Sequence, residues 1–457
     1  ADINCELIHL NSIATELDNL DYQTQRNRIS NNFIIEETTI GDLTEKRNDV
    51  MSLRRRLLQF VGEYSNWDLK NDSMYTNCAI NMVGKINGNC NVLLDSFAGG
   101  GSIPLEGQRI GLKAIATDIN PIPIILNKLQ LIQLPQLELE KVVENCKSLA
   151  ININEHLKNK VSAFYPKITH DGIDEIPTGY LCARMIICEG INCGVKFPLI
   201  SSPWIGTSKE GKFAYDFYEQ DGIVRVNPIK SPQKEKLHKT CTGGNATCPM
   251  CGHTTSVESV RRQLISKNGG SKDSQLLIII TKKKKGTGRY FRVPDESQIN
   301  AREKAVEFLS EYKSSSKESI EITEPLPPKG SLGTRVQGYG MMKWGDLYSS
   351  RQLLASLILC GEIKKIKNPI ERTILALATS KFSDKNSTLS TWAVSKSFFN
   401  QTFKSHRLQM TWDYYEPLPF GQKGQFGPNF LNTVDGVCKG LFSAKTLNTK
   451  NIGEVFY

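Results

Sequence analysis

Residues 93–121, LLDSFAGGGSIPLEGQRIGLKAIATDINP, combine residue types that could hold a nucleotide-like cofactor. Asp95 and Asp118 each follow an apolar run, and three glycines, Gly99 to Gly101, separate the first run from a helix-like segment. In doubly wound α/β folds, cofactors bind outside the carboxyl ends of the strands. Glycine lets the backbone approach such a ligand closely, and a carboxylate at the end of the second strand accepts the ribose hydroxyls. The spacing predicts strand, cofactor loop, helix and strand in a Rossmann-like, doubly wound α/β fold.

The same stretch indicates which cofactor is expected. The dinucleotide pattern Gly-x-Gly-x-x-Gly and the Gly-Lys-Ser/Thr end of a phosphate loop are both absent, which disfavours a polyphosphate ligand. The additional acid, Asp95, disfavours an anion and favours a cationic, amine-bearing ligand such as S-adenosylmethionine (SAM). A tight strand-to-helix turn without any ligand is the alternative.

Two cysteine pairs could bind a metal. CEGINCG contains Cys188 and Cys193, and CPMCGH contains Cys248 and Cys251. Cysteine pairs next to glycine form knuckle turns, and two pairs complete a tetrahedral four-thiolate Zn²⁺ site with no position left for substrate. We therefore expect a structural zinc. Ordinary thiols are the alternative, Cys241 could replace one ligand, and a redox role lacks the usual strand–helix context.

A basic and aromatic segment, TKKKKGTGRYFRVP (281–294), follows an apolar strand. Lysines and arginines could track phosphates with salt-sensitive affinity, and an aromatic ring could stack on a base. A solvated hairpin tip explains the segment equally well. The candidate nucleic-acid contacts are Lys282, Lys283, Lys284, Lys285, Arg289, Tyr290 and Arg292.

Composition sets the broad class of the protein. The chain has 457 residues, 39% hydrophobic residues and a net charge of +10, which suits a polyanionic partner but is also compatible with simple solubility. No apolar run approaches the ~20 residues of a membrane span, and no export leader is visible. We expect a cytoplasmic protein without a membrane partner, whose twelve cysteines are reduced thiols or metal ligands.

Hydrophobic periodicity predicts the elements around these residues. Residues 54–86 read as two helices interrupted at NWDLKNDS, a helix after Asn120 ends near Pro135, and LLIIIT (276–281) reads as a buried strand. Four parts are expected: an N-terminal helical or irregular segment (1–53), a SAM-binding half-domain (54–165), a β-rich, zinc-ribbon-like insertion that could recognise DNA (166–300), and a helical remainder (301–457).

The blocks DSFAGGGSIPLEGQRIGLKAIATDINP, RLLQFVGEYSNWD, KWGDLYSSRQLL, NSTLSTW and MTWDYYEPLPF resemble one known family. They are similar to the large prokaryotic adenine-specific DNA methyltransferases with a Cys-rich insert, within the SAM-dependent DNA amino-methyltransferases. Ser96 stands where that family usually has proline. The resemblance implies a SAM-dependent methyltransferase fold with a β-rich zinc-binding insertion. It also implies a cofactor site formed by Asp95, Phe97, Ala98, Gly99, Gly100, Gly101, Asp118, Ile119 and Asn120, with Asp118 at the ribose.

One motif of that family is missing. Amino-group methylation uses an Asp/Asn/Ser-Pro-Pro-aromatic loop that binds the exocyclic amine and stacks on the flipped base. SSPWI (201–205) has one proline, and EPLPF (416–420) separates its two prolines, so neither matches. In the resembling proteins the loop follows the WDYYE-like block, beyond Tyr457, so the catalytic residues stay unknown.

These observations lead to an expected function. The chain is expected to be the SAM-binding part or subunit of a site-specific DNA methyltransferase in restriction–modification or phage defence. Adenine N6 is favoured over cytosine N4, and a second protein subunit would supply the catalytic loop; a partial chain and a regulatory relic are the competing explanations. The alternatives in function are a zinc-stabilised nucleic-acid-binding subunit without catalysis and an RNA methyltransferase.

Overall fold

The computed structural model shows a mixed α/β protein. It describes residues 10, 12–21, 50–66, 69, 72–88, 91–208, 210–233, 237–283, 288–315, 322–328, 330–394, 398–403, 407–422, 427–445 and 452–457. The chain forms two compact units, which we call unit 1 (residues 1–142 and 439–457) and unit 2 (residues 143–438). Across the described part of the chain, no helix is long and apolar enough to cross a membrane.

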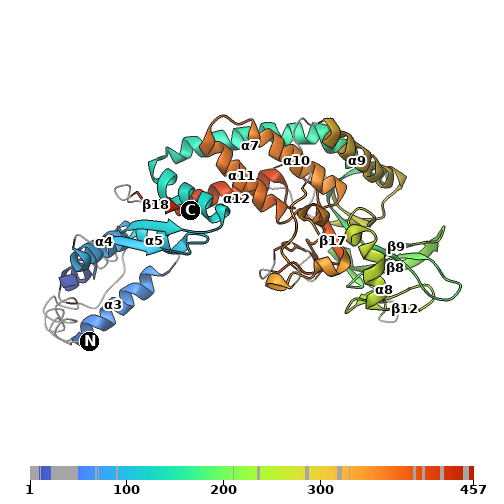
Figure 1. Ribbon diagram of the computed structural model, residues 1–457, viewed down its shortest axis with the longest axis horizontal. Helices are drawn as coiled ribbons and strands as arrows, with labels where there is room; N and C mark the ends of the chain where they lie inside the picture. Colours follow the sequence, from blue (N-terminus) through green and yellow to red (C-terminus); the bar gives the residue numbers. More distant parts are fainter. Residues whose placement is uncertain are drawn as a thin grey trace. The chain divides into compact units, whose positions relative to one another are not determined.

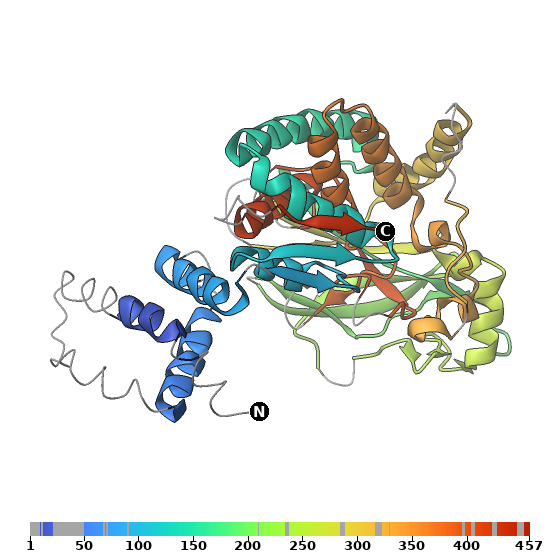
Figure 2. The same cartoon turned by 60° about the vertical axis from the view of Figure 1, so that its left-hand side comes forward.

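Unit 1 contains a three-stranded parallel sheet. Its strands are β1 (Val92–Asp95), β2 (Lys113–Thr117) and β18 (Glu454–Phe456), in the order β1–β2–β18. Figure 2 shows the C-terminal strand lying beside the two strands that the sequence predicted on either side of the glycine loop. The last residues of the described chain therefore complete the sheet that carries Asp95.

Two helices of unit 1, α4 (Ser73–Asn87) and α6 (Pro121–Asn127), begin at side chains that cap their free N–H groups. The Asp72 carboxylate accepts hydrogen bonds from Met74 N and Tyr75 N, and the Asn120 amide oxygen accepts one from Ile122 N. The two helices predicted within residues 54–86 are confirmed, as is the helix after Asn120. The bounds are α3 (Val50–Tyr64), α4 (Ser73–Asn87), α5 (Ser102–Arg109) and α6 (Pro121–Asn127), continued by a π-helical turn, η3 (Lys128–Gln133), and a 3₁₀ turn, η4 (Leu134–Gln136).

The two faces of the unit 1 sheet differ. Ala114, Ala116 and Leu131 are fully buried together on one face. On the other, Val92 and Leu94 are 52% and 63% exposed. Parallel sheets are ordinarily covered on both faces. In the described part of unit 1, one face of β1 is instead exposed.

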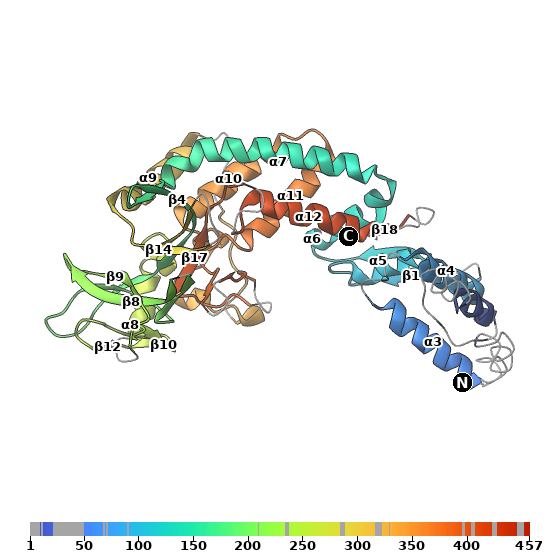
Figure 3. The same cartoon turned by 180° about the vertical axis from the view of Figure 1, so that it is seen from behind.

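Helices of unit 2 are shown in Figures 1 and 3, where α10 and α11 run alongside α7. Asn145 Nδ2 of α7 donates to Glu371 Oε1 of α11 at 2.9 Å. Ser349 and Gln352 form a capping box at the start of α10, and Asn368 caps α11. The bounds are α8 (Val257–Ile265), α9 (Glu296–Ser315), α10 (Ser350–Lys364) and α11 (Pro369–Ser383). Two further helices cross the division of the chain: α7 (Leu139–Val161) begins in the residues of unit 1, and α12 (Phe430–Ala444) ends in them. Short turns are η5 (Ser162–Phe164), η7 (Asn268–Gly270), η8 (Ser331–Gly333), η9 (Val336–Tyr339) and η10 (Trp344–Leu347).

The central sheet of unit 2 is antiparallel, in the order β14–β13–β4–β17, with β3 also paired to β4. The predicted buried strand LLIIIT is confirmed, because residues 276–281 lie within β13 and are all buried. The bounds are β3 (Ile168–His170), β4 (Ile173–Ala183), β13 (Gln275–Lys283), β14 (Tyr290–Arg292) and β17 (Asp413–Pro417).

A second five-stranded sheet of unit 2 has the order β5–β6–β9–β8–β7 and includes the long β8–β9 hairpin (Figure 3). Segment 166–300, predicted to be rich in strands, contains β3 to β14. The bounds are β5 (Met185–Ile187), β6 (Lys196–Pro198), β7 (Trp204–Ser208), β8 (Gly211–Gln220) and β9 (Ile223–Lys230). Two smaller sheets are formed by β10 (Cys241–Thr242), β11 (Asn245–Thr247) and β12 (Thr254–Thr255), and by β15 (Trp392–Ala393) and β16 (Phe398–Phe399).

Candidate cofactor site and metal centre

The glycine loop connects the tips of two neighbouring parallel strands. Asp95 pairs with Ala116 at the end of β1, so Asp95 and Asp118 project from the same edge of the sheet. Asp118 Oδ2 accepts a hydrogen bond from Gly99 N at 2.9 Å, and its Oδ1 accepts one from Asn120 N at 2.8 Å. The second carboxylate therefore holds the loop that follows the first.

The loop requires glycine at position 101 for two reasons. Gly101 has φ +79°, which L side chains rarely adopt, and an added Cβ would lie 2.3 Å from Asn127 Oδ1 and 2.9 Å from Gln130 Oε1. Asn127 Nδ2 also donates to Gly99 O at 3.0 Å. Asn127 Oδ1 and Gln130 Oε1 are buried and have no hydrogen-bond partner in the described chain. The amides of α6 and η3 thus pack closely beneath the loop.

Two apolar side chains project from the strand tips into solvent. Phe97 is 88% exposed and Ile119 is 85% exposed. Ala98, by contrast, is 8% exposed, and its N–H donates to Thr117 O at 3.0 Å, so it joins the two strand ends. Phe97 and Ile119 are free to flank a flat, partly apolar ligand.

The electrostatics of the loop favour a ligand that donates hydrogen bonds. The N–H groups of Asn120 and Gly99 lower the pKa of Asp118, so this carboxylate stays ionised well below neutral pH. Asp95 Oδ1 accepts from Phe97 N at 3.1 Å. Each carboxylate oxygen has a further lone pair, so the two acids can accept ribose hydroxyls or an amine. Nine predicted cofactor residues lie in this loop and at the end of β2: Asp95, Phe97, Ala98, Gly99, Gly100, Gly101, Asp118, Ile119 and Asn120.

The structure brings the four predicted cysteines together in unit 2. The Sγ atoms of Cys188, Cys193, Cys248 and Cys251 all lie within 4.8 Å of one another. Cys188 Sγ is 3.5 Å from Cys251 Sγ, and Cys193 Sγ is 3.9 Å from Cys248 Sγ. A tetrahedral metal with metal–sulfur bonds of about 2.3 Å requires sulfur atoms about 3.8 Å apart. The cluster could therefore hold a metal ion.

The backbone of each cysteine pair is fixed by its own turn. Cys193 N donates to Gly190 O, and Cys248 N donates to His253 O. The N–H of His253 is the largest influence that lowers the pKa of the exposed Cys251 thiol, to about 7, whereas burial raises the pKa of Cys188. Cys241, the alternative ligand, is buried outside the cluster, as is Cys182.

The residues of the basic and aromatic segment (281–294) differ in what they contact. Lys283 and Arg292 lie over the Tyr290 ring, each 5.1 Å from its centroid, and Arg289 lies 6.0 Å from the Trp392 centroid. Arg292 also forms an ion pair of 2.5 Å with the buried Glu175 carboxylate. Lys282 is half-buried on β13; Lys284 and Lys285 lie outside the described residues.

Two proline-containing segments that resemble a catalytic loop have structural contacts instead. Ser201 N and Ser201 Oγ both donate to the Asp413 carboxylate. Pro417 is buried in β17, opposite Gly179 of β4. Neither segment presents the paired prolines that would position an amine.

Sequence reasoning did not single out Asn127 and Gln130. Their only signal was their place on the helix after Asn120, where polar residues in an otherwise apolar stretch face the buried side of the loop. The contact of Arg289 with the Trp392 ring was also not predicted, because the strand of Trp392 lies far from the basic segment in sequence. No model of a known protein family matches the chain, and neither do curated proteins or solved structures.

Proposed function

We propose that this chain is the SAM-binding part of a DNA amino-methyltransferase, with adenine N6 favoured over cytosine N4. The observation that carries the proposal is the loop between β1 and β2, where Asp95 and Asp118 flank consecutive glycines and the exposed Phe97. In a Rossmann-like arrangement this edge is where an adenosine cofactor binds. When bound there, SAM supplies a methyl group on a sulfonium that a nucleophilic amine can attack.

The chain's own residues would bind and orient that cofactor. Asp118 would accept the ribose hydroxyls, since it is ionised and only partly buried just beyond the tip of β2. Asp95 would accept hydrogen bonds from the ammonium group. Phe97 and Ile119 would cover the faces of the adenine. Two carboxylates would repel a phosphate, which argues against a polyphosphate cofactor.

The four-cysteine cluster supports a structural Zn²⁺ in unit 2. Thiolates select zinc among common divalent ions, and all four positions would be filled by protein, which suits stability rather than catalysis. The ion would join the turn after β5 to the turn before β12, two segments about 60 residues apart in sequence. Closing a loop of this length costs conformational entropy, which the metal bonds would offset.

The bare side of β1 supports a contribution from a second polypeptide. Among the described strands, none pairs with the edge of β1 away from β2, and the side chains of Val92 and Leu94 are exposed on one face of this edge strand. An unpaired edge strand with exposed apolar side chains is a place where another strand adds. A partner strand at this edge would place its own carboxyl end beside Asp95, where a catalytic loop would meet the methyl donor.

A different function, a zinc-stabilised nucleic-acid-binding subunit without catalysis, is favoured by unit 2. Lys212 Nζ lies 3.6 Å from the Trp204 ring centroid, and Arg289 lies over Trp392. Cation and aromatic pairs of this kind bind single-stranded nucleic acid through phosphates and stacked bases. This reading does not need the glycine loop to bind SAM.

Methyl transfer from labelled SAM separates these functions. The full chain would be assayed on DNA and on RNA, alone and together with the protein encoded next to it. Transfer to DNA only with the partner is the result we expect, and transfer to RNA would redirect the proposal. Tight nucleic-acid binding with no transfer and no SAM binding under any condition would support the non-catalytic subunit and overturn the methyltransferase.

A further inference from the structure

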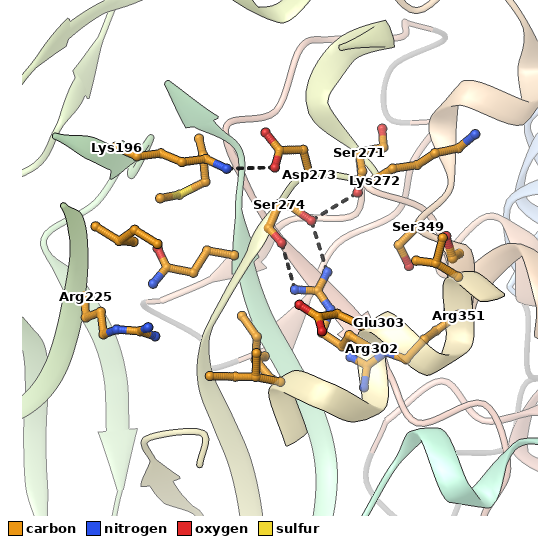
Figure 4. Close-up of a pocket in the computed structure, with 17 residues that line it drawn as sticks. Lys196, Arg225, Ser271, Lys272, Asp273, Ser274, Arg302, Glu303, Ser349 and Arg351 are labelled. Atoms are coloured by element: carbon orange, nitrogen blue, oxygen red, sulfur yellow. Dashed lines mark hydrogen bonds and ion pairs between the residues drawn. The ribbon is translucent and has the colours of Figure 1, made fainter. Parts of the chain in front are cut away.

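Unit 2 contains a cavity of about 370 Å³ that shares no residue with the glycine loop or the cysteine cluster. Its walls come from β6, β9, the start of β13, α9 and the start of α10 (Figure 4). Small-molecule sites commonly occupy about 300–1,000 Å³. The cavity is therefore large enough for a small ligand.

Positive side chains dominate the lining of this cavity. Five basic residues line it, against two acidic ones, Asp273 and Glu303. Asp273 is already shared by two lysines, since Lys196 Nζ and Lys267 Nζ lie 2.8 and 2.7 Å from its carboxylate oxygens. The cavity carries more positive charge than its own acids neutralise.

Two guanidinium groups contribute to this excess of positive charge. In the described part of the chain, neither Arg225 nor Arg302 has a carboxylate within ion-pair distance. Among the described residues, Arg302 donates only to neutral partners, Ser274 O at 2.9 Å and Ser274 Oγ at 3.1 Å (Figure 4). Arg225 Nε is buried and has no hydrogen-bond partner among the described residues. A buried donor of this kind is costly unless a ligand satisfies it.

An acceptor lies beside these donors. Gln275 Oε1 is buried without a hydrogen-bond partner in the described chain. Gln275 and Arg225 also line a neighbouring cavity of about 290 Å³, so both side chains stand between two empty volumes. A ligand that fits would carry an anionic group and also a hydroxyl or amine donor.

We propose that this cavity binds the phosphate group of a nucleotide. The planar fork of a guanidinium matches two phosphate oxygens, and Arg225 and Arg302 would bind them from β9 and α9. Gln275 Oε1 would accept a hydrogen bond from a hydroxyl or amine of the nucleoside. The phosphate could belong to a free mononucleotide or to a nucleic-acid backbone. The proposal is independent of SAM binding at the glycine loop.

Calorimetry on the full chain tests the proposal, with inorganic phosphate, AMP, adenosine and a short 5′-hydroxyl oligonucleotide as the probes. We expect AMP to bind more tightly than adenosine by at least about tenfold, which corresponds to about 1.4 kcal/mol. Competition by the oligonucleotide would assign the site to a nucleic-acid backbone, and its failure to compete would assign it to a mononucleotide. The same titrations on the Asp118→Asn chain separate binding at the cavity from binding at the glycine loop. Binding of adenosine as tight as that of AMP to the Asp118→Asn chain would overturn the proposal.

Variants locate the binding to the cavity. Arg225→Gln and Arg302→Gln should each weaken AMP binding at least about tenfold. Lys304→Gln is the matched control, because Lys304 is exposed on α9, outside the cavity lining, and its loss changes the net charge equally. Thermal unfolding of each variant, with and without AMP, reports folding and ligand stabilisation together. AMP affinity unchanged in the folded Arg225→Gln chain would contradict the proposal.

Discussion

At the scale of single residues, backbone conformation decides which glycine of the loop can be replaced. Three glycines are adjacent in sequence, but the structure makes different demands on two of them. Gly101 combines a positive φ with an approach to Asn127, whereas a Cβ at Gly100 would meet nothing within 4 Å. The pattern of glycines predicted a loop, but not which glycine is indispensable.

This difference yields a matched pair of variants. Gly101→Ala should destabilise the protein by about 1–3 kcal/mol, because it forces strain at φ +79° and displaces Asn127. Gly100→Ala should change stability by less than about 0.5 kcal/mol. Urea unfolding monitored by circular dichroism measures both. Equal effects of the two substitutions would show that the loop does not have the described conformation.

Charged residues of the basic segment also differ in what they contact. Arg292→Gln should cost about 3 kcal/mol, since it leaves the buried Glu175 carboxylate without its cation. Lys282→Gln, on the same sheet, should leave stability within about 0.5 kcal/mol and instead weaken binding to a DNA probe. Denaturant unfolding and fluorescence anisotropy separate the two effects. A stable Arg292→Gln chain with weakened DNA binding would reassign Arg292 to the interface.

At the scale of elements, local sequence patterns predicted the helices and strands that depend on residues close in sequence. The helices α3 and α4, the strands β1 and β2 and the buried β13 follow from periodicity, caps and turn residues close in sequence. β18 could not be predicted this way, because Glu454–Phe456 is short and its pairing with β2 depends on residues more than 330 positions away. The convergence of four cysteines could be predicted, because thiolate pairs beside glycine have one dominant structural use.

The cysteine cluster predicts one zinc ion per chain. Cys248→Ser should remove most of that zinc and destabilise unit 2, because the remaining thiolates no longer complete a tetrahedron. Cys241→Ser is the control, as Cys241 is also buried but lies outside the cluster. Elemental analysis together with thermal unfolding before and after chelation measures the outcome. Zinc retained by the Cys248 variant, or absent from the wild type, would contradict the assignment.

The unpaired edge strand β1 predicts where a partner binds. Leu94→Lys should leave folding intact, because Leu94 is 63% exposed, yet it should reduce methyl transfer with the partner protein by about tenfold or more, since a charge opposes strand addition. Leu58→Lys, at a residue 64% exposed on α3, is the control. Pull-down and transfer assays report the result. Full activity of the Leu94 variant would place the partner elsewhere.

At the scale of the whole molecule, the candidate sites are divided between the two units. Unit 1 carries the glycine loop and its acids, and unit 2 carries the cysteine cluster, the cation and aromatic pairs and the basic cavity. The net charge of +10 predicted a polyanionic partner in general terms. It could not predict the cavity, because Arg225, Gln275 and Arg302 come from three elements that only the fold brings together.

The division into units also explains why the cofactor loop can be tested independently of catalysis. Each carboxylate of the loop is held by backbone N–H groups of unit 1 itself. The site should therefore form whether or not a second protein is present. Binding of the cofactor, rather than turnover, is the property that this chain should show alone.

Calorimetric titration of the full chain with SAM tests the central claim most directly. We predict that the wild type binds SAM, that Asp118→Asn weakens binding at least about tenfold, and that Glu140→Gln, at an exposed acid of unit 1, leaves it unchanged. Thermal unfolding would confirm that each variant is folded. A wild-type chain that is folded and does not bind SAM would contradict the account.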